Sequence, residues 1–443
     1  MRDRIVAAVK AAGVVGAGGA GFPTHIKVNA DAEIVIVNGA ECEPLLRAHQ
    51  NIMVSESAKL ILGLQTVMLA TGARRGYIGI KRKYEAAIAK LQTELQQMNA
   101  TDIELFFIPD MYPAGDEQVL VHEVTGRIVP EGGIPLHVGV VVANVETLVN
   151  VALALEGQPV IEKYVTVTGA ARHPLTVRVP IGMAVGEVIQ LAGGSTVSDF
   201  AIIDGGPMMG RIIPADSVIT KTTGGLILLP EGHSLVVQKR TPWPVIANRA
   251  KAVCCNCRAC TDVCPRYLLG HRLEPHRIMQ AIGSGQMNET EVLAKAFLCS
   301  ECGACETYGC TMGLSPRRVN AELKQQFGKA GLKNPNTMKP QHAQLGRENR
   351  RIPTKRLLYR LGLEQYDVKA PLRLEPVTTA QVKLLLSQHI GAPSQPVVEV
   401  GTRVNKGDIV AVIPAGAALG ATLHASISGQ VYNIDTWIGI RAV

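Results

Sequence analysis

The first 150 residues alternate between short apolar runs and longer amphipathic stretches. The short runs are rich in β-branched residues, as buried strands are. Helical patterns lie between them, for example at 55–72 and 83–98. Strands that alternate with helices predict a largely parallel sheet. The predicted strands are 33–39, 76–81, 103–109 and 138–145.

The remaining residues change pattern three times. Residues 159–238 show strand alternation broken by turns, with one short helix stopped by two glycines, which predicts a small β-grasp domain. Residues 239–330 hold nine of the ten cysteines and predict mostly helix and loop. Residues 370–443 return to short strands with glycine turns, which predicts a sandwich of two hairpins. We therefore expect a multidomain α/β and α+β chain, with a Rossmann-like α/β domain over 1–158.

A basic stretch separates the cysteine-rich region from the C-terminal strands. Residues 316–356 carry eleven Lys and Arg against two Glu, with Pro, Gly and Asn scattered among them. Such a charge run is typical of a solvated connector, and we place a basic linker at 331–369. A nucleic-acid-binding arm is the alternative. Aromatics make up only 4% of the chain and no helix-turn-helix pattern is present, so we expect no nucleic-acid partner.

The composition says more about the cellular compartment of the protein than about its function. The 443 residues are 47% hydrophobic and 19% charged, as in a globular chain with several buried cores. The net charge of +8 permits an anionic partner without naming one. No signal sequence and no long uncharged apolar run is found, so we expect a cytoplasmic protein without a transmembrane segment. Thiols stay reduced there, and ten cysteines then predict metal binding rather than disulfides.

The cysteines form two runs with iron–sulfur spacing. In "CCNCRACTDVCP" at 254–265, four of the five cysteines give C-x2-C-x2-C-x3-C-P, the spacing of bacterial 4Fe–4S ferredoxins. "CSECGACETYGC" at 299–310 gives C-x2-C-x2-C-x4-C. In two-cluster ferredoxins the fourth cysteine of each run binds the other cluster. We therefore expect one 4Fe–4S cluster on Cys254, Cys257, Cys260 and Cys310, and a second on Cys264, Cys299, Cys302 and Cys305.

Two zinc sites are the alternative, since they would also use eight thiolates. Zinc ribbons pair one C-x2-C with a distant C-x2-C, whereas here a triple at three-residue spacing occurs twice. This spacing favours clusters over zinc. Cys255 is out of phase with its triple, so we expect that it is not a ligand.

A glycine-rich loop near the N-terminus contains Gly16-x-Gly18-x-x-Gly21. The dinucleotide-binding fingerprint has this pattern but requires a strand before it and a helix after it. Here the preceding residues read as a helix and Pro23 follows at once, so that interpretation fails its context. A loop of bare backbone N–H groups can still hold a phosphate, and Lys27 could add charge.

A second candidate segment, "VNGAECEP" at 37–44, directly follows a predicted strand. Asn38, Glu41 and Glu43 then lie at the carboxyl end of that strand, where α/β sheets usually bind ligands. Two carboxylates there could hydrogen-bond a flavin or a nicotinamide ribose. An ordinary helix N-cap, with Glu favoured by the helix dipole, explains the segment equally well.

Four segments of the first domain resemble a known family. They are similar to the signature segments of the NADH-oxidising flavoprotein subunit of respiratory complex I, and more closely to the RnfC subunit of the Rnf electron-transport complex. Over nearly the whole chain the resemblance is to the corrinoid (cobalamin) reductases of propanediol-utilising bacterial microcompartments. The segments are "GAGGAGFPTHIK" at 16–27, "VNGAECEP" at 37–44, "YPAGDEQVLVHEVTGR" at 112–127 and "VVVANVETLVNV" at 140–151.

The resemblance also implies the order of the domains. It runs from an FMN/NADH domain (1–158) to an SLBB β-grasp domain (159–238), a helical two-cluster ferredoxin domain (239–330) and, after the linker, a barrel-sandwich hybrid domain (370–443). In the RnfC subunit the barrel-sandwich part lies at the N-terminus. Its C-terminal place here favours the microcompartment enzymes.

The resemblance further implies FMN, bound non-covalently, and NADH as the hydride donor. Glu43 and Glu117 are the implied catalytic residues of the nicotinamide pocket. Phe22 stands where the complex I subunit has an aromatic on the nicotinamide side. The implied cofactor-binding residues are Gly16, Gly18, Gly19, Gly21, Phe22, Lys27, Asn38, Glu41, Glu43, Tyr112, Gly115, Asp116, Glu117, Asn144 and Thr147.

Some residues depart from the family pattern. Where complex I subunits have "NGDEGEP" this chain has Ala40 and Cys42, and "AGDE" replaces "CGEE". FMN is still expected, and the geometry of NADH binding is less well defined. No D-x-H-x-x-G corrinoid signature occurs. A corrinoid acceptor would therefore dock transiently or arrive on a partner protein.

Together these features predict an electron-transfer oxidoreductase. Electrons would pass from NADH through FMN and two clusters to an acceptor, expected to be a corrinoid in a bacterial microcompartment. The expected partners are NAD(H), a corrinoid or corrinoid-processing enzyme, and a shell protein. Two alternatives remain: an NAD⁺-recycling or shell-crossing electron conduit, and an Rnf-type subunit or docking scaffold without NADH oxidation of its own.

Overall fold

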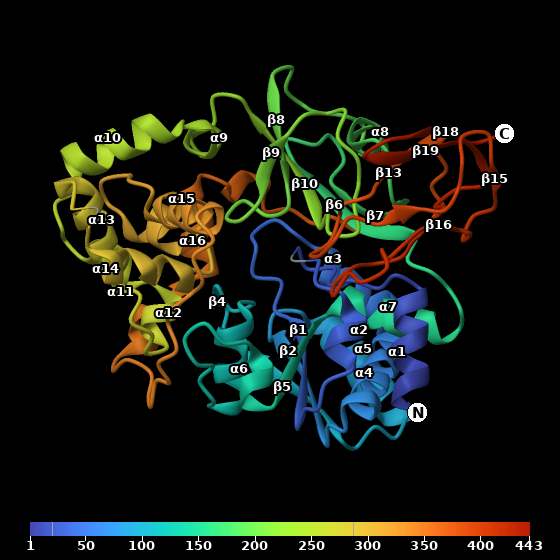
Figure 1. Ribbon diagram of the computed structural model, residues 1–443, viewed down its shortest axis with the longest axis horizontal. Coiled ribbons are helices and arrows are strands. Elements are labelled where there is room, and N and C mark those ends of the chain that lie inside the picture. Colours follow the sequence, from blue (N-terminus) through green and yellow to red (C-terminus); the bar gives the residue numbers. More distant parts are fainter. Residues whose placement is uncertain (20, 287) are drawn as a thin grey trace.

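The computed structural model describes residues 1–443 apart from Ala20 and Met287. Figure 1 shows four regions. The N-terminal α/β domain lies below a second sheet in the centre, the helices of the cysteine-rich region lie to one side, and the C-terminal strands lie to the other. The middle sheet therefore joins the other three regions.

The N-terminal domain is built on a four-stranded parallel sheet. Its strands are β1 (Ile34–Gly39), β2 (Arg75–Lys81), β3 (Ile103–Ile108) and β5 (Val140–Asn144). Their order is β3-β2-β1-β5 and each neighbouring pair is parallel, which confirms the predicted parallel sheet. Its helices are α1 (Arg2–Ala11), α2 (Thr24–Val28), α3 (Ala48–Ser55), α4 (Ser57–Thr71), α5 (Glu85–Gln97), α6 (Glu117–Thr125), the short η1 (Pro135–Val138) and α7 (Val145–Leu155).

Helices cover both faces of this sheet. Val35 and Val37 of β1 belong to the core that includes α4 and α7, whereas Ile36 belongs to the core that includes α6, as the two-residue period of a strand requires. α4 and α7 cross closely because residue 63 is glycine: a Cβ at Gly63 would lie 2.0 Å from the carbonyl oxygen of Leu148. Within the described residues no single helix is long and apolar enough to span a membrane, and one pair, α3 with α4, passes that test only together and is bent by 93°.

The second sheet has the strand arrangement predicted for a β-grasp domain. β6 (Glu162–Gly169) and β7 (Leu175–Pro180) form an antiparallel hairpin, followed by α8 (Val185–Leu191). β10 (Gly225–Pro230) returns parallel to β6. β8 (Phe200–Asp204) and β9 (Arg211–Ile213) extend the sheet on one side, and β12 (Leu372–Arg373) adds a strand from the C-terminal part on the other.

The cysteine-rich region is helical with loops, as predicted. Each cysteine run leads into a short helical turn, and Pro265 and Pro316 begin helices at positions where a missing N–H costs nothing. The elements are α9 (Ser234–Arg240), α10 (Trp243–Val253), α11 (Ala259–Asp262), α12 (Pro265–Leu268), α13 (Pro275–Ser284), α14 (Thr290–Ala294), η2 (Lys295–Leu298), η3 (Ala304–Gly309) and α15 (Pro316–Lys329).

The basic stretch is not a solvated connector along its length. Its first part forms α15, and β11 (Ile352–Pro353) pairs with β4 (Met111–Tyr112) of the N-terminal domain. Arg347 of η4 (Arg347–Arg350) is buried and paired with Glu123 of α6 at 2.5 Å. The charge run was misleading here because Glu123, the acidic partner of Arg347 and Arg351, lies 224 and 228 positions away. α16 (Thr354–Leu361) and η5 (Glu364–Tyr366) then lead to the last strands.

The C-terminal region forms two small sheets, as the predicted sandwich requires. One has the order β13-β19-β18-β15 and the other β14-β16-β17. Buried Val382, Ile438 and Ile440 pack into the same core as the N-terminal domain. The strands are β13 (Gln381–Leu385), β14 (Gln395–Pro396), β15 (Arg403–Val404), β16 (Ile409–Val412), β17 (Leu423–His424), β18 (Gly429–Ile434) and β19 (Trp437–Arg441).

Candidate flavin and iron–sulfur site

The carboxyl edge of the parallel sheet gathers residues from three of the four signature segments. Asn144 ends β5, and Asn38, one residue before the end of the neighbouring strand β1, is in register with it. Gly18 of the glycine loop lies against Asn144, since a Cβ at Gly18 would be 3.0 Å from its Nδ2. The amide of Ala17 donates to the Thr147 hydroxyl at 2.9 Å. The structure thus brings the glycine loop, Asn38 and Asn144 to one edge of the sheet, and their contact with a flavin stays a prediction.

The glycine loop is shaped as a backbone cradle. It follows α1 rather than a strand, which confirms that the dinucleotide fingerprint lacks its context here. The Gly16 amide donates to the Phe22 carbonyl at 2.9 Å and the Gly21 amide to the Gly16 carbonyl at 3.2 Å. Gly19 has φ of 107° and open space where a Cβ would stand. A bare loop of this kind fits the phosphate end of a flavin mononucleotide.

Lys27, Phe22 and Glu117 form a rim next to this cradle. Lys27 donates to the Glu117 carboxylate at 3.1 Å and to the Val142 carbonyl at 3.1 Å. Its ammonium lies 6.0 Å from the centre of the Phe22 ring. Both charged side chains stay partly exposed, so this rim is accessible to a ligand.

Glu41 caps a helix. Its carboxylate accepts from the amides of His49 and Gln50, at 2.8 and 3.3 Å, at the start of α3. The Gln50 side chain donates to it as well. Of the two explanations for the acidic turn, the structure places Glu41 in the N-cap role, and its contact with a flavin stays a prediction.

Glu43 connects the acidic turn to the β-grasp domain. Its two oxygens accept from the amides of Met208 and Met209 at 2.9 and 3.0 Å. Burial raises the pKa of Glu43, against the lowering effect of these amides and of Lys239. A Cβ at Gly206 would lie 2.0 Å from Glu43 Oε2, so glycine is needed for this approach. Its predicted role next to a nicotinamide is untested.

Tyr112 and Asp116 join the flavin-binding candidates to the cysteine-rich region. The buried Tyr112 hydroxyl donates to the carbonyl of Cys302. Arg266, two residues after Cys264, donates to Asp116 at 2.6 Å, and their side chains are only 11% and 8% exposed. Burial alone would raise the pKa of Asp116, but Arg266 and the α6 amides outweigh it and lower the pKa. Asn38 Nδ2 in turn donates to the Gly115 carbonyl at 2.7 Å.

The cysteines divide into two sets that cross between the runs. Burial, then the neighbouring thiols of Cys310, Cys254 and Cys257, and last that of Cys264, raise the pKa of Cys260 to about 12. Cys260, Cys310, Cys254 and Cys257 line one small cavity, together with the exposed Cys255. We call Cys254, Cys257, Cys260 and Cys310 the outer cysteine set.

The remaining four cysteines form the inner cysteine set: Cys264, Cys299, Cys302 and Cys305. Burial, and then Cys299, Cys302 and Cys264, raise the pKa of Cys305 well above its usual value. Cys264, from the first run, therefore faces the second run, and Cys310 faces the first. Among the described residues no three His, Cys, Asp or Glu side chains close on a single ion.

Two buried lysines next to the glycine loop could not be identified as site residues from the sequence. Lys163 pairs with Glu146 and donates to the Ala17 carbonyl at 3.3 Å. Lys221 of the β-grasp domain donates to the carbonyls of Gly13 and Thr422, at 2.6 and 2.9 Å. The only available signal was a lysine within an apolar strand pattern, "EKYVTVTG" at 162–169, for Lys163.

Comparisons with protein families match this architecture in order. The Nuo51 FMN-binding domain matches residues 9–153, the SLBB domain 164–212, the 4Fe-4S dicluster domain 253–315 and the RnfC barrel sandwich hybrid domain 362–441. The fold expected from the sequence is thereby confirmed. The chain is a flavin and iron–sulfur protein, with FMN and 4Fe–4S clusters as its cofactor classes.

Curated relatives narrow this class to one family. The cobalamin reductase PduS of Salmonella typhimurium is 46% identical over 98% of this chain and 95% of its own length. The C subunit of the Na⁺-translocating ferredoxin:NAD⁺ oxidoreductase complex of Acetobacterium woodii is 35% identical over 60% of this chain and 58% of its own. The chain therefore belongs to the cobalamin reductase PduS family.

Solved structures agree on the fold alone. An NAD⁺-reducing NiFe hydrogenase in its H₂-reduced state superposes with a TM-score of 0.50 at 22% identity. The match covers 76% of this chain and 64% of the hydrogenase chain.

Proposed function

We propose that this chain is an NADH-dependent oxidoreductase that passes electrons through FMN and two 4Fe–4S clusters to a corrinoid acceptor. The observation that carries the proposal is the direct contact between the flavin-binding candidates and the cysteine-rich region. Tyr112 touches the Cys302 carbonyl, and Asp116 pairs with Arg266. The segments that would line the flavin thus also contact the inner cysteine set.

These contacts favour one order in which electrons would pass from the flavin through the two clusters. The inner cysteine set is the one that the N-terminal domain touches, through Cys302 and through Arg266 beside Cys264. The outer cysteine set lines a cavity whose described lining residues all lie between 254 and 316. Electrons from the flavin would therefore reach the inner cluster first and leave from the outer one.

The residues of the N-terminal domain would bind and orient the flavin and the nicotinamide. FMN, when bound, accepts a hydride and releases its two electrons singly. The loop that carries Gly16, Gly18, Gly19 and Gly21 would surround its phosphate, and Lys27 would neutralise part of the charge. Glu117, paired with Lys27 and partly exposed, is better placed than Glu43 to touch the nicotinamide.

Two relatives support the choice of substrates. The name cobalamin reductase supports a corrinoid acceptor, and the name of the Rnf-type subunit supports NAD(H). We place the protein in the cytoplasm, associated with a bacterial microcompartment, as the resemblance of the signature segments implies. The domain boundaries at 158, 238, 330 and 369 are proposed with it.

An anaerobic titration tests the proposal. Protein purified without oxygen, with iron, sulfide and flavin quantified, is titrated with NADH while the flavin and cluster absorbance are followed. We expect the flavin to bleach and cobalamin to be reduced afterwards. A flavin that does not bleach would refute NADH oxidation. Intact clusters in protein that carries no flavin would favour the docking-scaffold alternative.

A further inference from the structure

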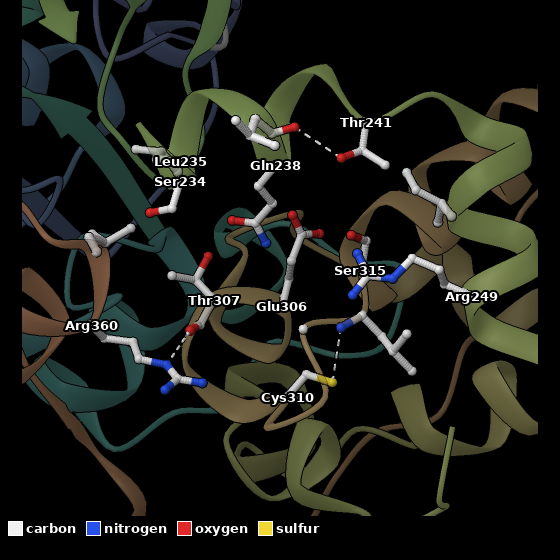
Figure 2. A pocket seen from close by; sticks show the side chains of 15 residues that line it. Ser234, Leu235, Gln238, Thr241, Arg249, Glu306, Thr307, Cys310, Ser315 and Arg360 are labelled. Carbon is white, nitrogen blue, oxygen red and sulfur yellow. Dashed lines mark hydrogen bonds between the residues drawn. The ribbon is translucent and has the colours of Figure 1, made fainter. Parts of the chain in front are cut away.

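A cavity of about 380 Å³ opens next to the outer cysteine set. Figure 2 shows its polar side chains coming from helices above, below and beside it. Its described lining residues all lie between 234 and 361, outside the N-terminal domain. The polar side chains used below are Ser234, Gln238, Arg249, Glu306, Cys310 and Arg360.

Cys310 connects this cavity to the outer cluster. Among the described lining residues it is the one that belongs to the eight predicted ligands. Its sulfur accepts from the Leu314 amide at 3.3 Å, which fixes it at the cavity wall. A molecule in the cavity would therefore contact a ligand of the outer cluster, at the opposite end of the route from the flavin.

Glu306 gives the cavity a buried acceptor that needs a donor. Glu306 is 5% exposed, and its Oε2 has no hydrogen-bond partner among the described residues. The nearest cation, Arg317 Nε, stands 3.6 Å from that oxygen and compensates charge without a hydrogen bond. Buried acceptors are nearly always satisfied. An occupant that brings an N–H group would satisfy this one.

The rim of the cavity supplies donors. Arg249 and Arg360 are exposed, and Arg360 donates only a long bond of 3.3 Å to the Thr307 carbonyl. Figure 2 shows Gln238 extending from α9 toward Glu306. Donors at the rim and an acceptor within match a primary amide, which carries both a carbonyl and an NH₂ group. A simple anion would instead face the Glu306 carboxylate.

We propose that this cavity is the acceptor site and that it binds the amide-bearing edge of a corrinoid. The proposal rests on the proposed function, because it takes the corrinoid as acceptor. The cavity is smaller than a whole corrinoid, so one edge of the ring enters it. The outer cluster would give one electron to each cobalt, and one NADH, which supplies two electrons through FMN, would therefore reduce two cobalts by one electron each.

Two variants test the assignment in the full chain loaded with FMN and both clusters. Arg360→Ala removes an exposed rim donor, and Ser234→Trp fills the cavity from the exposed start of α9. Arg277→Ala is the matched control, because Arg277 is exposed in the same domain, pairs only with Glu274 and does not line the cavity. Hydroxocobalamin is the probe, with binding measured by equilibrium dialysis and reduction measured with NADH. Ferricyanide reduction by NADH reports on the flavin independently.

The loss of one charge-assisted hydrogen bond predicts about a tenfold weaker hydroxocobalamin affinity for Arg360→Ala. Ser234→Trp should abolish binding, with iron content and ferricyanide reduction unchanged. Hydroxocobalamin binding that is equal in wild type, Arg360→Ala and Ser234→Trp overturns the assignment, as does wild type that binds none. Wild type that binds hydroxocobalamin, loses it in Ser234→Trp and does not oxidise NADH would support the cavity and refute the proposed function instead.

Discussion

Asp116→Asn tests the ion pair with Arg266 independently of the second role of the Asp116 side chain, which is to cap α6. Asp116 also caps α6, accepting from the amides of Gln118 and Val119 at 3.0 and 3.2 Å. Asn is as good an N-cap as Asp. Asp116→Asn therefore keeps the cap and removes the negative charge that faces Arg266.

The expected cost follows from burial of the pair. Removing one partner of a buried ion pair usually costs about 3–5 kcal/mol, because the other charge is left uncompensated. Arg266 also faces the thiols of Cys302 and Cys264, which become negative when they bind iron. In cluster-loaded protein we therefore expect a loss of stability at the lower end of this range, about 3 kcal/mol. That corresponds to about a 100-fold increase in opening of the interface.

Hydrogen exchange by mass spectrometry measures this opening locally, which suits a chain of several domains. Faster exchange is expected in α6 and in α12, which carries Arg266. Glu104→Gln is the control: its pair with Arg75 is more than half exposed, so its loss should cost less than about 1 kcal/mol. If Asp116→Asn exchanges no faster than Glu104→Gln at these helices, the pair does not hold the two domains together.

Three further changes test other parts of the structure. Cys255→Ser should leave about eight irons per chain, whereas Cys254→Ser should lose one cluster, as iron analysis would show. Burial lowers the pKa of Lys221 from 10.5 to about 7, so the unfolded chain binds more protons above pH 7. Stability to urea should rise from pH 7 toward 10, by at most about 1.4 kcal/mol per pH unit, and less steeply in Lys221→Met. Gly206→Ala forces a Cβ against Glu43 and should cost about 1–3 kcal/mol, whereas Gly224→Ala, with open space, should have little effect on thermal unfolding.

Features that depend on residues close together in the sequence could be predicted from it. The parallel sheet follows from β-branched runs that alternate with helical ones. The two cysteine runs follow from a three-residue spacing. The expected exchange of Cys264 and Cys310 between the runs follows from the general arrangement of two-cluster ferredoxins. The structure places Cys310 beside the first run and Cys264 beside Cys305, and which cluster each of them binds stays a prediction.

Pairings over long distances could not be predicted. The sequence predicts that Glu43 contacts a ligand. In the structure the amides of Met208 and Met209, 165 and 166 positions away, donate hydrogen bonds to it. The sequence predicts Arg347 in solvent, but Glu123 neutralises this arginine from 224 positions away. A charged side chain shows its sign in a sequence but not its partner, and the partner decides whether it is solvated or buried.

The signature segments therefore carry two roles at once. Asn144 faces the glycine loop and Asn38 lies in register beside it, whereas Glu43, Tyr112 and Asp116 hold the β-grasp domain and the inner cysteine set. A flavin bound at this edge would thus contact residues that also support the inner cluster. Loss of NADH oxidation in a variant of Tyr112 or Asp116 would follow from a displaced cluster as readily as from a lost flavin contact. Iron content and hydrogen exchange at α12 distinguish the two causes, because only a displaced cluster domain changes them.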